Sequence, residues 1–167
     1  MNSTNTTDIF YKQLQELWSA ENMLVEAMPV MIEKAHLLGL KKSLAHHLAE
    51  TDKHKVAIEA ICKLLGINPQ GEENKDLKMI LEEGEKAIAV ETNIDASDKA
   101  IIRGAEKIEQ YEIAAYEPVA EAAQALGYEG IAKRLRLTLE EERQAETKMK
   151  FMDKSFIQKT SVLGPLA

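Results

Sequence analysis

Four stretches of the sequence place apolar residues at alternating intervals of three and four positions, and this spacing constrains the fold more than any other feature. It puts the apolar residues on one face of an α-helix, in the narrow seam typical of helical bundles. The stretches cover residues 8–36, 40–65, 101–126 and 131–152. They predict an all-α protein whose helices bury these seams against one another.

The breaks between the stretches predict how the helices are connected. Gly39 separates the first two stretches and Gly127 separates the last two, and turns this short make consecutive helices antiparallel neighbours. The connection between the two hairpins, residues 66–95, is too long for a structureless loop in a compact domain. The apolar spacing from Leu77 to Ile88 predicts a short fifth helix there. Two antiparallel hairpins joined by a long crossover predict the ferritin-like type of four-helix bundle.

The chain of 167 residues fits a single bundle of this type. Residues 1–7 are polar, and we expect a disordered N-terminus there. Residues 8–153 are expected to form the ferritin-like four-helix bundle. Residues 154–167 contain Ser, Thr, Gly and Pro and are expected to form a C-terminal tail.

Composition excludes several classes of function. The formal net charge is −7, from 21 basic and 28 acidic residues, which argues against a basic surface for nucleic acid. No apolar run approaches the roughly 18 residues that span a membrane, and no secretory signal is visible at the N-terminus, so we expect a cytoplasmic protein. The single cysteine, Cys62, cannot form an internal disulfide or a cysteine-rich metal site.

Ionisable residues interrupt each of the four apolar seams near its middle. They are Glu21 in the first stretch, Glu50 and His54 in the second, Glu109 and Glu112 in the third, and Glu142 and Glu146 in the fourth. In an antiparallel hairpin, residues equally distant from the turn lie side by side. Glu21 pairs with His54 in this way, Glu112 pairs with Glu142, and Glu109 pairs with Glu146. The sequence therefore predicts that these residues meet at one level of the bundle.

Six carboxylates and one imidazole inside a bundle require protons or bound cations, because each desolvated charge costs several kcal/mol. Carboxylate and imidazole ligands suit iron or manganese, with zinc as a further alternative. Two divalent ions supply less charge than six carboxylates, so we expect Glu109 and Glu146 to orient a ligand, share a proton or face outward. The alternative for any single glutamate is an exposed position, because a seam shifted by one residue turns it toward solvent.

Four further residues lie close in sequence to the residues of the predicted centre. His47 is a seam residue, expected as a core histidine with satisfied hydrogen bonds; the alternative is that it orients a metal ligand. Tyr111 and Tyr116 flank Glu112 and are expected to pack with satisfied hydroxyls, with a redox role as the alternative. Glu141 is expected on a solvated helix face.

Four segments carry a family resemblance: ELWSAE at 16–21, HLAET at 47–51, EQYEIAAY at 109–116 and TLEEE at 138–142. Over about residues 8–152 the sequence resembles the YciF-type family of ferritin-like bacterial stress proteins. Glu109 and Glu112 also resemble the paired glutamates on the third helix of rubrerythrin-like proteins. The resemblance implies a di-metal site with two iron ions per chain, a homodimer, a cytoplasmic location and a link to stress responses.

The sequence departs from the general di-iron carboxylate pattern at two points. That pattern has Glu-x-x-His on the second and fourth helices. Here Glu50 and His54 are four residues apart, which keeps them on one helix face, and Glu146 stands where a histidine is expected. These differences leave the identity of the metal and its redox behaviour open.

We therefore expect a metal-binding bundle that handles oxygen, peroxide or iron under stress, without nucleic-acid or membrane partners. Di-iron oxidoreductase activity is one form of this function. The first alternative is a non-enzymatic dimeric bundle or scaffold with structural metal only. The second is iron storage in a hollow cage, which requires many subunits.

Overall fold

The computed structural model describes the backbone of residues 3–162 and the side chains of residues 6–156. It contains five helices in this range: α1 (Ser3–Lys34), α2 (Leu38–Leu65), α3 (Lys75–Ala89), α4 (Ile94–Ala125) and α5 (Glu129–Val162). No strand occurs among the residues with a described backbone. The prediction of an all-α fold with a short helix in the crossover is confirmed.

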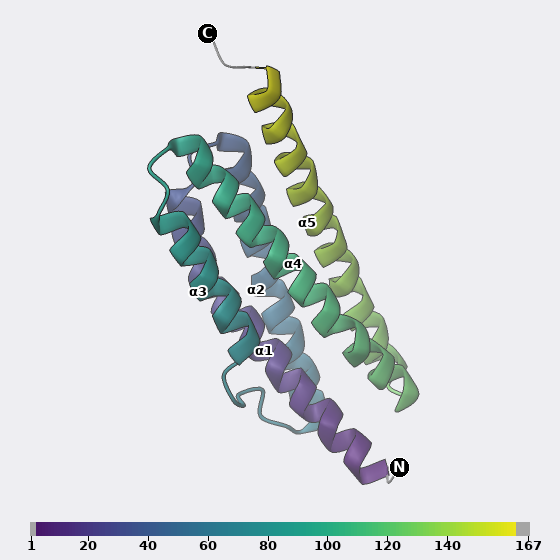
Figure 1. Ribbon diagram of the computed structural model, residues 1–167. Helices are drawn as coiled ribbons and strands as arrows, with labels where there is room; N and C mark the ends of the chain where they lie inside the picture. Colours follow the sequence, from purple (N-terminus) through teal and green to yellow (C-terminus); the bar gives the residue numbers. More distant parts are fainter. Residues whose placement is uncertain (1–2, 163–167) are drawn as a thin grey trace.

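The four long helices form a bundle of two antiparallel hairpins, α1–α2 and α4–α5 (Figure 1). Helix α1 also packs against α4, and α2 packs against α5, so α2 and α4 lie on a diagonal of the bundle. These two helices run in the same direction, and the crossover between them carries α3 along α4 and α1. This connectivity confirms the predicted ferritin-like bundle.

Glycine ends two of the helices, as the sequence predicts. Gly66 follows α2 with φ = 71°, and Gly127 lies between α4 and α5 with φ = 79°, in a region where other residues are strained. The predicted break at Gly39 is wrong, because Gly39 lies inside α2 and the chain turns at residues 35–37. Buried Asp98 fixes this turn by accepting hydrogen bonds from the backbone N–H groups of His36 and Leu37, each at 2.7 Å.

The helices extend further toward both termini than the sequence predicts. Helix α1 begins at Ser3, so residues 3–7 are helical where disorder was expected. Their Ser, Thr and Asn residues disfavour a helix by only about 0.5 kcal/mol each, which an established helix can tolerate. Helix α5 includes residues 154–162, where a tail was expected, and its Phe156 packs against buried residues of the bundle. The predictions for residues 1–2 and 163–167 lie outside the described residues.

Two large apolar clusters occupy opposite ends of the bundle. The first core cluster includes Phe10, Leu14, Leu17, Ile58, Tyr116, Val119, Leu135 and Leu139. The second core cluster consists of Ala35, Leu40, Leu44, Ile101, Ile102, Ala105 and Met149. The first cluster takes side chains from all four long helices, and the second takes them from α2, α4, α5 and Ala35, directly after α1. A smaller cluster packs Leu77 of α3 against Leu24, Met28 and Ile108. Between the two large clusters the seam of each long helix carries ionisable residues.

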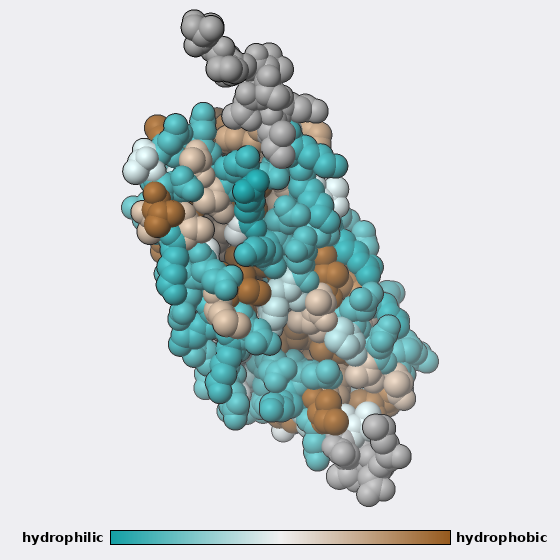
Figure 2. All heavy atoms as spheres, in the orientation of Figure 1, coloured by the Kyte–Doolittle hydropathy of each residue, from teal (hydrophilic) through white to brown (hydrophobic). Residues whose placement is uncertain are grey.

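The face of the molecule in Figure 2 is mainly hydrophilic, with hydrophobic residues in scattered patches. This surface agrees with a chain that is 29% charged. Within the described part of the chain, no helix has the length and apolar character needed to cross a membrane.

Candidate metal centre

The centre of the bundle buries carboxylates and imidazoles from all four long helices. The residues with at most 4% exposure are Glu21 of α1, His47 and His54 of α2, Glu109 and Glu112 of α4, and Glu142 of α5. On each helix these residues occupy the same face, at the same spacing of three and four, as the apolar residues of the two core clusters. The predicted convergence of Glu21, His54, Glu112 and Glu142 is therefore what the structure contains.

These side chains form two groups that share one residue. The first metal group is His47, Glu109, Glu112 and Glu142, and the second metal group is Glu21, His54 and Glu142. Within each group, one potential ligand atom from every residue lies within 4.8 Å of the others. Glu142 belongs to both groups and presents one oxygen to each histidine.

The distances around each histidine define the centre. In the first metal group, His47 Nε2 lies 3.1 Å from Glu109 Oε1 and 3.7 Å from Glu142 Oε2. In the second metal group, His54 Nδ1 lies 2.8 Å from Glu142 Oε1 and 3.7 Å from Glu21 Oε1. Each histidine thus directs one ring nitrogen toward carboxylate oxygens in the interior.

The other ring nitrogen of each histidine faces a carboxylate at the edge of the centre. His54 Nε2 contacts Glu141 Oε2 at 2.6 Å, and His47 Nδ1 lies 3.7 Å from Glu50 Oε2. Carboxylates in this position fix the orientation and tautomer of a metal-binding histidine. The arrangement leaves Nδ1 of His54 and Nε2 of His47 available to a metal ion.

Two tyrosines complete the surroundings. The buried hydroxyl of Tyr116 donates a hydrogen bond to Glu21 Oε1. The other carboxylate oxygen, Glu21 Oε2, has no hydrogen-bond partner among the described residues. Tyr111 lies away from the two groups and contacts Asn74 at the start of α3.

Burial changes the protonation of the central carboxyls. Burial raises the pKa of Glu21 well above its usual range, and the charges of Glu112 and Glu142 raise it further. Burial likewise raises the pKa of Glu109, and burial together with Glu142 raises the pKa of Glu112 to about 7. Burial opposes ionisation of Glu142 too, but its close contact with His54 and the charge of His47 lower its pKa. Glu142 is therefore the carboxylate that stays ionised most readily.

The two imidazoles respond in the opposite sense to burial. Burial disfavours the protonated form of both rings. The surrounding carboxylates together outweigh this effect, chiefly Glu112 and Glu50 around His47 and Glu142 and Glu141 around His54, so the pKa of each histidine is raised. Protons therefore compensate part of the negative charge when no cation is bound.

The donor set fits two divalent cations. Buried atoms without a hydrogen-bond partner among the described residues include Glu21 Oε2, both oxygens of Glu112 and of Glu142, and the inward nitrogens of both histidines. Ligand atoms about 2.1 Å from one ion lie about 3–4 Å apart, which is close to the observed spacing. The four carboxylates in the two groups carry four negative charges when ionised, which two divalent ions would balance.

The structure does not bring Glu50 and Glu146 into either metal group. The Glu50 side chain is 22% exposed and contacts His46 and His47. The Glu146 side chain is 18% exposed and forms an ion pair at 2.6 Å with Lys150, one turn further along α5. Glu146 lies one turn beyond Glu142, whereas Glu50 lies beside the centre, next to Thr51 in α2; both side chains are partly exposed.

Three residues of the centre were assigned other roles from the sequence. Glu109 was expected to orient a ligand, share a proton or face outward, and it lies buried in the first metal group. His47 lies within the first metal group, and its two ring nitrogens lack hydrogen bonds of normal geometry, although it was expected as a satisfied core histidine. Its seam position, seven residues before His54, is the signal that indicates this place. Glu141 was expected on a solvated face, and its side chain is 43% exposed, but it also contacts His54. No sequence pattern distinguishes Glu141 from Glu140.

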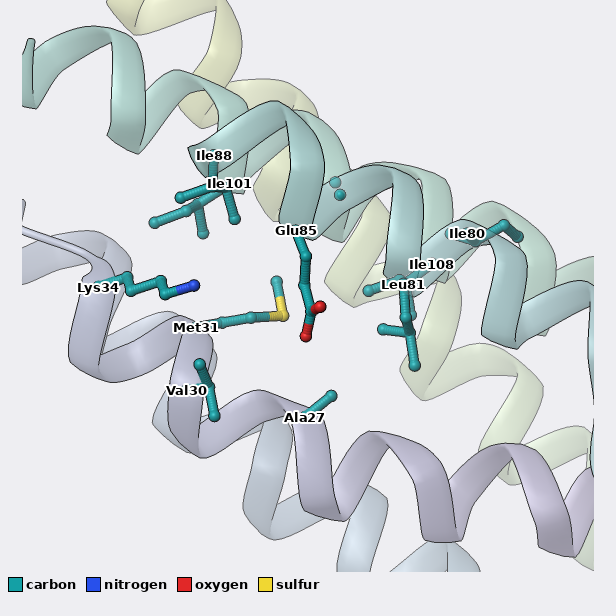
Figure 3. A pocket seen from close by; sticks show the side chains of 12 residues that line it. Ala27, Val30, Met31, Lys34, Ile80, Leu81, Glu85, Ile88, Ile101 and Ile108 are labelled. Atoms are coloured by element: carbon teal, nitrogen blue, oxygen red, sulfur yellow. The ribbon is translucent and has the colours of Figure 1, made fainter. Parts of the chain in front are cut away.

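A separate cavity of about 30 Å³ lies between α1, α3 and α4 (Figure 3). Its lining is mainly aliphatic, including Met31, Leu81 and Ile108, and its ionisable lining residues are Lys34 and Glu85. This combination has no set of carboxylates and imidazoles for a metal ion. Metal binding is therefore indicated at the bundle centre and not at this cavity.

Comparisons with known proteins place the chain among related sequences. The family model described as Domain of unknown function (DUF892) matches residues 5–161. Protein YciF of Escherichia coli (strain K12) is 31% identical over 157 residues, covering 89% of this chain and 90% of YciF.

Solved structures of similar proteins have the same fold. The E. coli stress protein YciF matches with a TM-score of 0.87 and 27% identity, over 95% of this chain and 99% of that one. YcfI from Rhodopseudomonas palustris, described as a structural protein, matches with a TM-score of 0.84 and 29% identity, over 90% of this chain and 98% of that one. A protein from Xanthomonas campestris pv. campestris matches with a TM-score of 0.72 and 17% identity, over 94% and 99%, and supports the fold alone.

Proposed function

Because the chain belongs to the DUF892 family and is similar over most of its length to the stress protein YciF, we propose that it is a ferritin-like di-metal protein of a stress response. In this proposal it binds two divalent cations at the bundle centre and handles oxygen, peroxide or iron. The observation that carries the proposal is the pair of buried metal groups that share Glu142.

The composition of the two groups supports iron as the first choice of metal. The donors are carboxylates and imidazoles without thiolates, and this set suits iron and manganese, with zinc as the alternative. When bound, a pair of iron ions would supply redox chemistry with oxygen or peroxide. His47, Glu109 and Glu112 would hold one ion, and Glu21 and His54 would hold the other.

The surrounding residues would keep these ligands in position. Glu142 would contribute to holding both ions, since it belongs to both metal groups and contacts both histidines. Tyr116 holds one oxygen of Glu21, and Glu141 holds the outer nitrogen of His54. The two core clusters pack on either side of this level. Such preorganised surroundings support a fixed coordination geometry.

Iron loading and peroxide consumption test the redox proposal. We expect the wild-type protein loaded with ferrous iron to consume peroxide or oxygen, and Glu112→Ala to lose this activity together with bound iron. Glu121→Ala, at an exposed position of α4, is the matched control. Equal consumption by the wild-type protein and Glu112→Ala would refute a reaction at this centre.

A structural role for the metal is the second candidate. Two observations favour it: the central ligands are almost completely buried, and the similar protein YcfI is described as structural. In this case metal raises the melting temperature without turnover of peroxide or oxygen. Melting curves and turnover assays on the same iron-loaded sample separate the two candidates.

The proposal also includes a homodimer and a cytoplasmic location. Size-exclusion chromatography with light scattering tests the first point, because a dimer has twice the chain mass of 18.7 kDa. An assembly of many subunits would instead favour iron storage. Fractionation of cells that express the protein tests the location.

A further inference from the structure

Thr51 is a fully buried residue of α2 that faces the metal centre. It follows His47 by four residues and precedes His54 by three, so the three side chains lie on one face of the helix. The two histidines are separated by about 10.5 Å along the helix axis, yet both contact Glu142. The side chain of Thr51 therefore lies between the two rings, at the wall of the centre.

The hydroxyl of Thr51 has no hydrogen-bond partner among the described residues. A Ser or Thr hydroxyl in a helix can bond to the carbonyl four residues earlier. Thr147 and Ser155 do so in this protein, with Oγ1 of Thr147 at 2.9 Å from the carbonyl of Arg143 and Oγ of Ser155 at 2.9 Å from that of Phe151. Thr51 forms no such bond, although its hydroxyl is more deeply buried. An unsatisfied buried hydroxyl is unfavourable, which points to a partner outside the chain.

We propose that Thr51 Oγ1 forms a hydrogen bond to a small ligand that enters the metal-loaded centre from solvent, of the size of hydrogen peroxide or azide. A hydroxyl both donates and accepts hydrogen bonds, so it suits a ligand with oxygen or nitrogen at its end. The dense packing of the two core clusters on either side limits the ligand to a few atoms. This inference rests on the proposed function, because cations at the two metal groups would attract such a ligand.

The metal-free protein gives the first test. Thr51→Val keeps the shape of the side chain and removes the hydroxyl. We expect the metal-free Thr51→Val protein to melt at a higher temperature than the metal-free wild type, because the substitution removes an unsatisfied polar group. A lower melting temperature would show that the hydroxyl already has a partner in the metal-free protein, from the chain or from a bound water, and would overturn the inference.

Azide binding to the iron-loaded, air-oxidised protein gives the second test. We expect Thr51→Val to bind azide about tenfold more weakly than the wild type in an absorbance titration, as the loss of one hydrogen bond predicts. Thr51→Ser keeps a hydroxyl and should bind within about twofold of the wild type. Thr147→Val, at an exposed position of α5, is the matched control and should not change azide binding.

The iron content of each sample distinguishes a failure of the Thr51 inference from a failure of the two-metal proposal. Equal azide affinity of Thr51→Val and wild type at equal iron content would overturn the inference and leave the two-metal proposal standing. Failure of the wild-type protein to take up iron, manganese or zinc would overturn both.

Discussion

The ends of the bundle and its centre use the same seam positions for opposite kinds of side chain. At the ends, the seams carry residues such as Leu14, Leu44 and Leu135, which pack in the two core clusters. At the centre they carry Glu21, His54 and other ionisable residues, equally buried. The difference shows that the ends stabilise the fold, whereas the centre contains polar groups whose burial is unfavourable without cations.

Truncation of an apolar residue at one end should have the largest effect. We expect Leu135→Ala to lower the free energy of unfolding by about 2–5 kcal/mol, because it leaves a cavity in the first core cluster. Urea denaturation measures this, and the number of metal ions per chain should not change. Leu137→Ala is the control, since Leu137 is 52% exposed. An equally small loss for both variants would contradict the assigned role of the ends.

Replacement of a central carboxyl should have the opposite sign. In the metal-free protein we expect Glu112→Leu to raise the free energy of unfolding by about 1–4 kcal/mol, because an apolar side chain replaces a buried ionisable group. The same variant should lose metal from the first metal group. Urea denaturation with a chelator measures the first effect, and Glu121→Leu is the exposed control. Destabilisation of the metal-free protein would show that Glu112 supports the fold directly.

A residue at the edge of the centre should change metal affinity without changing the fold. We expect Glu141→Ala to weaken metal binding by about 10–100-fold, because it removes the carboxylate that orients His54. Competition with a metal indicator measures the affinity. Glu140→Ala is the matched control, since Glu140 neighbours Glu141 and is exposed. Equal affinities of the two variants would exclude an orienting role for Glu141.

The dependence of stability on pH tests the raised pKa of Glu112. The pKa of Glu112 is about 7 in the folded metal-free protein, against 4.5 for the unperturbed group. The folded state thus binds this proton more tightly, and the stabilisation present below pH 4.5 is lost as the pH rises toward 7. We expect Glu112→Gln to remove this part of the slope in metal-free urea denaturation at several pH values. A slope unchanged by the substitution would contradict the raised pKa.

Bound metal should reverse the dependence of stability on pH, because protons and cations compete for the same ligands. The pKa values of Glu21 and Glu109 are also raised, so metal binding must displace protons from several groups. We expect the difference in melting temperature between metal-loaded and metal-free protein to increase as the pH rises from about 4.5 to 7.

The sequence predicts the bundle well because helical periodicity identifies a buried face over many residues. It also predicts the meeting of Glu21 with His54, since residues equally distant from a turn lie at one level. The exact turn is less predictable, because Asp98, far away in the sequence, fixes residues 35–37. The local sequence pattern, in which a glycine interrupts the apolar spacing, therefore placed the turn at Gly39.

The ligand set is less predictable than the fold. Successive side chains on a helix point in directions about 100° apart, and a difference of one turn along the helix can place a side chain in the interior or in solvent. Glu146 lies one turn beyond Glu142, where an ion pair with Lys150 holds it near the surface. His47 lies one turn before Thr51 and faces the centre. The sequence also gives no sign that Thr51 lacks a partner, because this depends on packing from all four helices.

Metal content after purification without chelators or a metal-affinity column tests the central claim most directly. Elemental analysis of the wild-type protein should give about two divalent ions per chain, one for each metal group, with iron as the expected metal. Glu142→Ala should lose most of this metal, because Glu142 belongs to both groups. A folded wild-type protein that contains no metal, and that takes up none from ferrous iron, manganese or zinc, would contradict the account.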